Sequence, residues 1–452
     1  MNFKLYTKVG LIIVLALLLM IPLGMISVVV YERSDYRNQV VNEIERTWTG
    51  TQTVAGPVLS IPYWIDVTET KVNKKTDARE SYTKRHMRTL YHVAQNLTIT
   101  SHAETQTRSR GIYSVPVYTS THRIVGEFDF SELKLIETQT PGFVSWGQPE
   151  LSLLVSDIRG ISGTPTLKWN RKDYSFVAGS AVPNFNAGVH ADVTIPKDTA
   201  RVPVELTLDL RGSQELSFIP LAEDLTARVS STWPHPKFDG QFLPADRDID
   251  ADGFTANWRM SSFATDARSK LVDCAKGREC HGVNQLSFGV KFFEPVDIYV
   301  KVTRAIKYGA LFIVLTFVAF FLTETLTRSR LHPLQYALVG LSLAVFYLLL
   351  VSLSEHLSFA TAYVVATLAC AGLIGVYLKG ALGQNRLAIT FTVGIGLLYA
   401  MLFSILRSED FALLMGSLLL FAMLALVMIL TRQIDWYAFG SGNTSEEAES
   451  ST

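Results

Sequence analysis

The 452-residue sequence lacks the short motifs by which many enzymes are recognised. It contains no G-x-S-x-G, no H-E-x-x-H, no Walker A loop, no protein-kinase motif set and no G-x-G-x-x-G. The run Ser81-Tyr-Thr-Lys84 satisfies S-x-x-K, but a pattern with two fixed positions is common by chance. It also lies in a basic, loop-like segment and does not open a helix. We therefore expect no enzymatic activity, no catalytic residue and no cofactor.

Few residues of the sequence have the spacing that is typical of metal ligands. The nearest pattern is Asp248, Asp250, Asp252 and Gly253, which match positions 1, 3, 5 and 6 of a calcium loop. The twelfth position holds Arg259 where a bidentate Glu is required, so two oxygen ligands are lost and a positive charge is added. We expect an acidic solvated turn, with a weak calcium site as the alternative. The histidines of the polar region show no ligand spacing (His86, His92, His102, His122, His190, His235, His281).

Cysteine is rare, with three residues in the chain. Cys370 falls in an apolar run, whereas Cys274 and Cys280 enclose Ala-Lys-Gly-Arg-Glu in the polar region. A close pair in an oxidising compartment can form a small disulfide loop. Two free thiols are the alternative. A zinc site that includes His281 would lack a second pair of ligands with metal spacing.

A surplus of charge is absent as well, because 41 basic residues balance 41 acidic ones. The balance also holds within residues 31–307 taken alone. This region has no net field that would attract nucleic acid or anionic lipid at long range. We therefore expect no nucleic-acid partner.

Long apolar runs are present, and they organise the chain. A bilayer core requires about twenty apolar residues per helix. The first run is too long for a signal-peptide core and no A-x-A-like site follows it, so an uncleaved anchor is favoured over a signal peptide. We predict a cytoplasmic N-terminus at 1–8, an anchor at 9–30, a polar domain at 31–307, a five-helix domain at 308–430 and a tail at 431–452. The five helices are predicted at 308–326, 334–353, 357–378, 387–406 and 411–430.

The positive charges beside these runs predict the orientation. With the N-terminus inside, the short outside loops carry only Arg407, while Lys301, Arg304 and Lys307 at the end of the long polar domain weigh little. Both termini are then cytoplasmic and residues 31–307 are periplasmic. The inside segments carry the remaining basic residues of the membrane part (Lys4, Lys8, Arg328, Arg330, Lys379, Arg386, Arg432).

The polar domain is predicted to be rich in β-strands. Residues 31–50 favour a helix that continues from the anchor and ends at Gly50. From Val54 to Val302, short alternating or β-branched runs are separated by Gly, Pro, Asn and Asp. We predict an α+β membrane protein with an antiparallel, sandwich-like domain, either one large sandwich or two packed ones. Residues 69–88 are expected to form a loop or a long hairpin arm, and the tail after Gly440 is expected to be disordered.

Glu324 is an ionisable residue within a predicted membrane span, which is by default a functional hypothesis. It lies near the cytoplasmic end of the span, four residues before Arg328. This spacing places the two side chains on one helix face. We expect a carboxylate that extends towards the interface and pairs with Arg328, with an intramembrane functional role as the alternative.

Several longer motifs resemble those of the inner-membrane protein CreD family. The resemblance covers most of the chain and is weakest at 65–135. In the C-terminal part it rests on Leu331-His332-Pro333, Ser354-Glu355-His356 and Thr431-Arg432-Gln433-Ile434-Asp435-Trp436-Tyr437. In the polar domain it rests on Gly56-Pro57, Asp157-Ile-Arg159-Gly160-Ile161, Trp233-Pro234-His235-Pro236-Lys237-Phe238 and Phe242-Leu243-Pro244-Ala245.

The resemblance implies a Gram-negative inner-membrane protein linked to cell-envelope integrity. It also implies control by a two-component system, tolerance to colicins and a role in the response to β-lactams. The family has no established reaction, so no catalytic residue is carried over. We expect a protein that acts non-enzymatically through its periplasmic domain, with envelope proteins or cell-wall components and membrane lipids as partners. A transporter or lipid handler built on the C-terminal helices is the alternative, and an envelope hydrolase is the second alternative.

Overall fold

The computed structural model describes residues 3–72, 79–185, 187–196, 199–278, 280–292, 298–327, 332–382, 385–407 and 412–432. The expected disorder after Gly440 and the side chains of Arg328 and Arg330 lie outside these ranges. The chain divides into two compact units. We call residues 1–38 with 296–452 the membrane unit and residues 39–295 the β unit.

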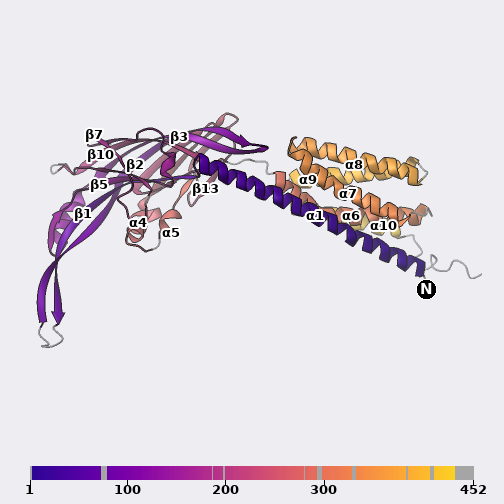
Figure 1. The fold of residues 1–452 in the computed structure, drawn as a ribbon, viewed down its shortest axis with the longest axis horizontal. Helices are drawn as coiled ribbons and strands as arrows, with labels where there is room; N and C mark the ends of the chain where they lie inside the picture. Colours follow the sequence, from indigo (N-terminus) through magenta and orange to yellow (C-terminus); the bar gives the residue numbers. More distant parts are fainter. Residues whose placement is uncertain are drawn as a thin grey trace, which may run out of the picture. The chain divides into compact units, whose positions relative to one another are not determined.

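The membrane unit is helical (Figure 1). Within the described residues, five helices have the length and composition to cross a membrane, and the apolar part of a sixth covers 414–429. A helix therefore lies at each of the six predicted membrane spans. The unit contains most of α1 (Phe3–Thr47) together with α6 (Ile298–Thr327), α7 (Pro333–Ser354), α8 (Phe359–Leu382), α9 (Asn385–Arg407) and α10 (Ala412–Thr431).

Two boundaries refine the predictions. Helix α1 runs without interruption to Thr47, which confirms the helix expected after the first apolar run. Helix α6 begins at Ile298, so the predicted β region up to Val302 was too long. The alternation of Val300, Lys301 and Val302 is typical of a strand, but these residues continue the helix whose later turns are apolar.

The start of α7 explains the Leu-His-Pro motif. The His332 side chain accepts a hydrogen bond from the Leu334 backbone N–H at 3.2 Å, and the Gln335 side chain accepts one from the His332 N–H at 3.0 Å. This reciprocal arrangement is a capping box. Pro333 occupies the first turn, where its missing N–H costs nothing.

The β unit is built from sixteen strands within the described residues. Most pairs are antiparallel, but β1 with β11 and β2 with β12 are parallel. The strands are β1 (Gln52–Val72), β2 (Arg79–Arg110), β3 (Tyr113–Asp129), β4 (Phe143–Trp146), β5 (Glu150–Val155), β6 (Thr166–Trp169), β7 (Lys172–Ser175), β8 (Val177–Ala178), β9 (Gly188–Asp192), β10 (Arg201–Ser213), β11 (Glu215–Ile219), β12 (Ala222–Ser231), β13 (Pro236–Gly240), β14 (Asp246–Asp250), β15 (Gly253–Ser261) and β16 (Phe288–Phe292).

Strand β2 links the two halves of this β structure. Its first half pairs with β1, and its second half pairs with β3 on one side and β12 on the other. The β1–β2 pairing extends to Val72 and Arg79, so the segment predicted as a loop or hairpin arm is an arm. Alternate residues of β10 are buried from Val202 to Leu210, as the period of two predicts. The largest buried side chains of the common core include Phe128, Trp169, Phe218, Trp258 and Phe288.

The sequence pattern did not reveal the helices of the β unit: α2 (Ser131–Gln139), α3 (Ser262–Thr265), α4 (Ala267–Ala275) and α5 (His281–Asn284). They are too short to show a clear helical period. Tertiary packing stabilises α4, because Leu271 and Cys274 are buried in a second core cluster that also contains Val93 and Leu286.

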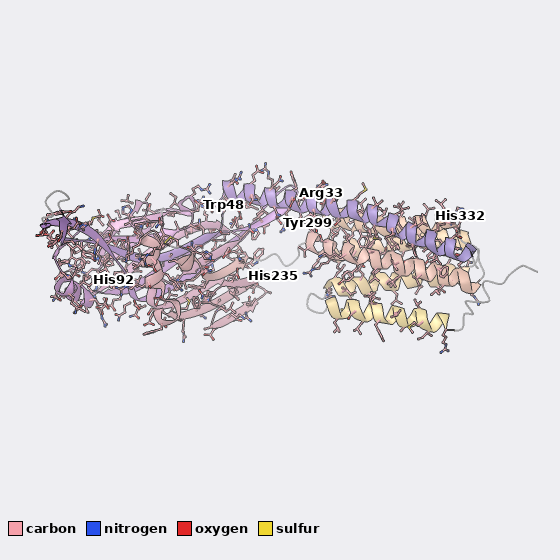
Figure 2. The ribbon with its side chains drawn as sticks, turned by 90° about the horizontal axis from the view of Figure 1, so that it is seen from below. Arg33, Trp48, His92, His235, Tyr299 and His332 are labelled. Atoms are coloured by element: carbon pink, nitrogen blue, oxygen red, sulfur yellow. A yellow bond between two sulfur atoms is a disulfide. The ribbon has the colours of Figure 1, made fainter. Side chains whose placement is uncertain are left out.

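The last turn of α1, which belongs to the β unit, is held by polar contacts. Glu45 accepts hydrogen bonds from Gln214 and Ser213, and Glu43 pairs with Arg110. Trp48 (Figure 2) follows the end of this helix, and the guanidinium groups of two arginines lie over its indole ring. The Cζ atom of Arg108 is 4.7 Å from the ring centroid, and that of Arg211 is 5.4 Å from it.

Candidate functional site

A polar cleft in the β unit gathers side chains from several distant segments. One cavity of about 250 Å³ lies between the middle of β2, the end of β3, the start of β12 and helices α2 and α4. A second cavity of about 710 Å³ shares Glu223 and Arg268 with the first and extends along α3 and α4. We call the two together the polar cleft. Its first part is lined by His92, Val93, Gln95, Asp129, Ser131, Glu132, Glu223 and Arg268.

His92 (Figure 2) is the most buried polar side chain of the cleft, with 8% of its surface exposed. Its Nε2 lies 2.9 Å from the Asp129 carbonyl oxygen, which can only accept, so Nε2 is the donor. The ring packs near Phe128 and Phe130. Burial lowers the pKa of His92, and the nearby positive charge of Arg268 lowers it further. The imidazole is therefore neutral at neutral pH.

The cleft also presents acceptors that have no partner. Gln95 Oε1 is buried and accepts no hydrogen bond from any described residue. The Glu223 carboxylate has neither a hydrogen bond nor an ion pair within the described part of the chain. Arg268 provides the positive charge and lies 3.6 Å from a carboxylate oxygen of Glu132. Because a buried acceptor without a partner is costly, this arrangement suits a ligand that brings N–H or O–H donors.

A serine, a histidine and an aspartate occur in the cleft, but their hydrogen bonds do not form a catalytic triad. Ser131 Oγ donates to Asp129 Oδ1 at 2.5 Å, and this bond is the first cause of the lowered pKa of Asp129. His92 donates to the backbone of Asp129 and has no hydrogen bond to Ser131. In a Ser-His-Asp triad the histidine is hydrogen-bonded to the serine hydroxyl and acts as its base. Sequence reasoning could not find this cleft, because no local spacing connects its residues.

Glu324 is paired across helices in the membrane unit. Its carboxylate forms an ion pair with Lys8 of α1 and accepts a hydrogen bond from the Tyr336 hydroxyl of α7 at 3.0 Å. The expected partner, Arg328, lies outside the described residues. Glu324 is 11% exposed, and two other helices supply partners for its carboxylate.

A second ion pair joins α1 to the opposite ends of α6 and α7. The Tyr299 hydroxyl of α6 donates to Glu355 at 3.1 Å, and Arg33 Nε of α1 lies 3.7 Å from the same carboxylate oxygen. Arg33 and Tyr299 are labelled in Figure 2. Glu355 belongs to the Ser354-Glu355-His356 motif, but no spacing in the sequence connects it to Arg33 or Tyr299.

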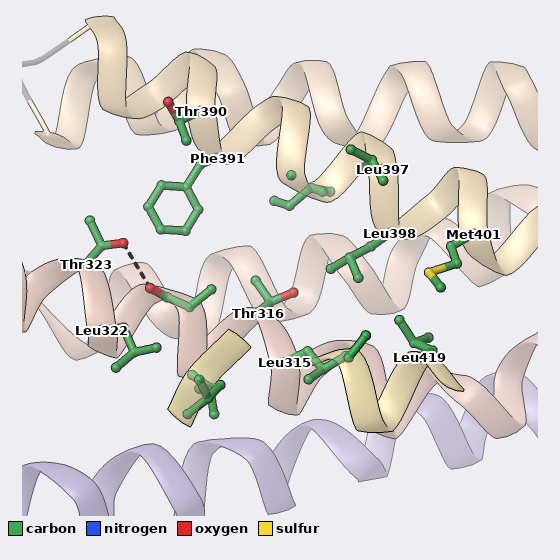
Figure 3. A pocket seen from close by; sticks show the side chains of 16 residues that line it. Leu315, Thr316, Leu322, Thr323, Thr390, Phe391, Leu397, Leu398, Met401 and Leu419 are labelled. Atoms are coloured by element: carbon green, nitrogen blue, oxygen red, sulfur yellow. Dashed lines mark hydrogen bonds between the residues drawn. The ribbon is translucent and has the colours of Figure 1, made fainter. Parts of the chain in front are cut away.

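An apolar pocket of about 550 Å³ lies between α6, α9 and α10 (Figure 3). The few polar groups on its wall are threonine hydroxyls. Those of Thr323 and Thr390 donate to carbonyl groups of their own helices, while Thr316 Oγ1 is buried with no partner among the described residues. The other side chains labelled in Figure 3 are apolar (Leu315, Leu322, Phe391, Leu397, Leu398, Met401, Leu419).

The candidate calcium residues lie in a β-hairpin. Asp248 and Asp250 belong to β14, and Asp252 lies in the turn before β15, where its N–H donates to Asp250 Oδ1 at 2.9 Å. The strands pair directly through Asp250 and Gly253, so the backbone does not wrap around a cation as a calcium loop does. Within the described residues, no group of three or more His, Cys, Asp or Glu side chains could hold a metal ion.

The cysteines are separated between the two units. Cys274 at the end of α4 and Cys280 before α5 form a disulfide. Cys370 is a free, buried thiol on α8. The structure thus has the small disulfide loop that the spacing suggested.

Comparison with known proteins shows the relationship of the whole chain. Residues 4–437 match the family model described as "Inner membrane protein CreD". Inner membrane protein CreD of Escherichia coli (strain K12) is 36% identical over 426 residues, which are 94% of this chain and 92% of that protein.

Similarity to solved structures is slight. Two structures of an M1 zinc metallopeptidase from Deinococcus radiodurans, at 9% and 8% identity, align with 37% of this chain and 38% of theirs, each at a TM-score of 0.18. This score is too low to support an argument about fold or function. The match along nearly the full length is decisive, and with it this multi-pass chain belongs to the CreD family of inner membrane proteins.

Proposed function

We propose that this CreD-family protein supports the integrity of the cell envelope under stress without catalysing a reaction. It does so by binding an envelope protein or a cell-wall component in the polar cleft. The observation that carries the proposal is a single cavity lined by Gln95, Glu223 and Arg268, in which the buried Gln95 Oε1 and the Glu223 carboxylate have no partner among the described residues. These groups are arranged for recognition. The link to the envelope comes from the family.

The proposal includes an orientation. Both termini lie in the cytoplasm and the β unit lies in the periplasm. The distribution of Lys and Arg around the apolar helices supports this orientation. The Cys274–Cys280 disulfide is also consistent with an oxidising compartment. Reporter fusions test this orientation. Alkaline phosphatase, which is active only in the periplasm, should be active when inserted at the Gly111 turn. A fluorescent protein that fluoresces only in the cytoplasm should fluoresce when fused to the C-terminus.

Photo-crosslinking in cells tests the binding proposal. A photoreactive amino acid replaces Phe263, which lines the polar cleft and is 100% exposed. The control position is Leu243, which is 69% exposed and does not line the cleft. We expect one discrete envelope component to be crosslinked from position 263, and Arg268→Ala or Glu223→Ala to reduce that product.

A phenotype links this binding to function. In a strain that lacks the chromosomal copy, the cleft variants should fail to restore resistance to detergents and envelope stress at normal protein levels. Full complementation by the double variant Arg268→Ala with Glu223→Ala would refute the role of the cleft. Covalent labelling of the β unit by a β-lactam or an activity-based probe would instead support the envelope hydrolase.

The second candidate function is lipid handling or transport by the membrane unit. The apolar pocket between α6, α9 and α10 favours it. If transport depends on the intramembrane carboxylate, Glu324→Gln should abolish the envelope phenotype while the amount of protein in the membrane stays normal. An unchanged phenotype would count against transport and leave the polar cleft as the better explanation.

A further inference from the structure

The apolar pocket lies along three helices. It is lined by residues between 315 and 323 of α6, between 390 and 401 of α9 and between 419 and 427 of α10. Its volume of about 550 Å³ falls within the range of roughly 300–1,000 Å³ that is typical of ligand sites. Its wall is apolar apart from three threonine hydroxyls. Two of these donate to carbonyl groups of their own helices, and Thr316 Oγ1 has no partner among the described residues. A hydrocarbon chain is therefore the ligand that matches most of this surface.

Positive charge lies just beyond the pocket on two of these helices. On α9, Arg386 precedes the lining residue Thr390 by one turn and Gly394 by two turns, so it lies on the same helix face. On α10, Arg432 follows the lining residue Val427. Arg386 and Arg432 are both exposed, and neither has an ion-pair partner among the described residues.

These positive charges indicate which kind of ligand with a hydrocarbon chain would bind. Arginine side chains near helix ends extend to the membrane interface, where the phosphate groups of lipids lie. A guanidinium group can bind a phosphate through two parallel hydrogen bonds. The apolar pocket therefore matches the acyl chain of an anionic phospholipid, and the arginines nearer the interface match its headgroup.

We propose that the pocket between α6, α9 and α10 binds an acyl chain of an anionic phospholipid whose headgroup lies against Arg386 and Arg432. This inference goes beyond the envelope function assigned to the polar cleft and does not depend on it. The lipid is a specific ligand of the membrane unit, in addition to the bulk lipid that surrounds any membrane protein.

The test uses the full-length protein in nanodiscs. A phosphatidylglycerol with a photoreactive group on its acyl chain is activated, and mass spectrometry locates the labelled peptides. We expect label in α9 and α10 at the pocket, where Met401 and Leu419 lie. Label spread equally over the exposed face of α8, which includes Leu368 and Val376, would overturn the proposal.

Two glycines provide matched variants. A Cβ atom at Gly394 on α9 or at Gly372 on α8 would meet no other atom within 4 Å, so both positions accept a larger side chain. Gly394→Trp should fill the pocket and reduce labelling at the pocket severalfold, whereas Gly372→Trp should not. Thermal unfolding establishes that both variants are folded. Equal labelling of both variants would refute the site.

The headgroup is tested separately. Competition with unlabelled phosphatidylglycerol or phosphatidylcholine measures the preference for the anionic lipid. Each of Arg386→Ala and Arg432→Ala should reduce this preference by about fivefold, since a basic side chain near an anionic headgroup contributes roughly 1 kcal/mol. If the unmodified protein shows no preference for phosphatidylglycerol over phosphatidylcholine, the proposal of an anionic headgroup is wrong.

Discussion

Lys8 of α1 forms an ion pair with Glu324 of α6 across 316 residues of sequence. The pair connects the first helix of the membrane unit to the second, and Tyr336 extends the contact to α7. At the other end of these helices, Arg33, Tyr299 and Glu355 form a corresponding contact. Polar contacts at both ends therefore hold α1 against α6 and α7.

We expect the Lys8–Glu324 pair to contribute a measurable coupling energy. In a double-mutant cycle with Lys8→Met and Glu324→Gln, the free energies of unfolding should be non-additive by about 0.5–1 kcal/mol, because the pair is only partly exposed. The exposed fractions are 29% for Lys8 and 11% for Glu324. Thermal or denaturant unfolding of the full chain in detergent is the measurement. Tyr336→Phe, which leaves the ion pair intact, is the control, and strict additivity would contradict the coupling.

The stability of the β unit should fall in mild acid because of His122. Its side chain is fully buried, and burial lowers its pKa from 6.5 to about 3. The unfolded chain then binds a proton at a higher pH than the folded chain does. His122 thus does not change the free energy of unfolding above about pH 6.5. As the pH falls from there towards 3, the folded state loses stability because protonation favours the unfolded chain. Between about pH 6.5 and 4.5 the loss should be roughly 2–3 kcal/mol.

His122→Gln separates this effect from the titration of carboxylates, which the variant and the unmodified protein share. Hydrogen exchange of β3 peptides at the two pH values should show a smaller loss of stability in the variant. His102→Gln, at an exposed position, is the control for the substitution itself. The lowered pKa of His92 acts in the same direction, so the variant should not lose all of the dependence. An identical dependence in the His122 variant would refute this explanation.

Reduction of the Cys274–Cys280 disulfide should destabilise α4 and α5 locally. The loop is short, with a sequence separation of 6, so the entropic contribution is about 2 kcal/mol at most. Hydrogen exchange of residues 267–284 in the presence and absence of a reductant measures the effect. Cys370→Ala on α8 serves as the control because that thiol is free. Unchanged protection after complete reduction would show that packing alone holds the two helices.

Gly160→Ala should destabilise the β unit by about 2–3 kcal/mol, which is typical of overpacking. An added Cβ atom would lie 2.6 Å from the Arg211 carbonyl oxygen and would clash with the Gln52 side chain. Gln52 donates to the carbonyl groups of Arg211 and Asp157 at 3.1 Å, so it cannot move without losing these bonds. Gly50→Ala is the matched control, since nothing lies within 4 Å of its Cβ position. Equal unfolding midpoints for both variants would contradict the clash.

Local patterns in the sequence determined the elements of this protein. The apolar runs predicted the six helices found in the described part of the membrane unit, because the length and polarity of a membrane span are properties of consecutive residues. The alternating runs of the polar domain predicted its strands for the same reason, and β10 is one of them. The Leu-His-Pro motif is likewise local, since the capping box that it forms involves only neighbouring residues.

The tertiary structure decided which of these elements meet. The polar cleft joins His92, Asp129, Glu223 and Arg268 from four separate segments, so no spacing in the sequence could indicate it. The same applies to two partners of Glu324, because no spacing in the sequence connects it to Lys8 of α1 or Tyr336 of α7. The pair with Arg328 stays a prediction, since Arg328 lies outside the described residues. A local period reports which face of an element is apolar. Only the packing of these faces determines which polar groups are enclosed together and which of them find partners.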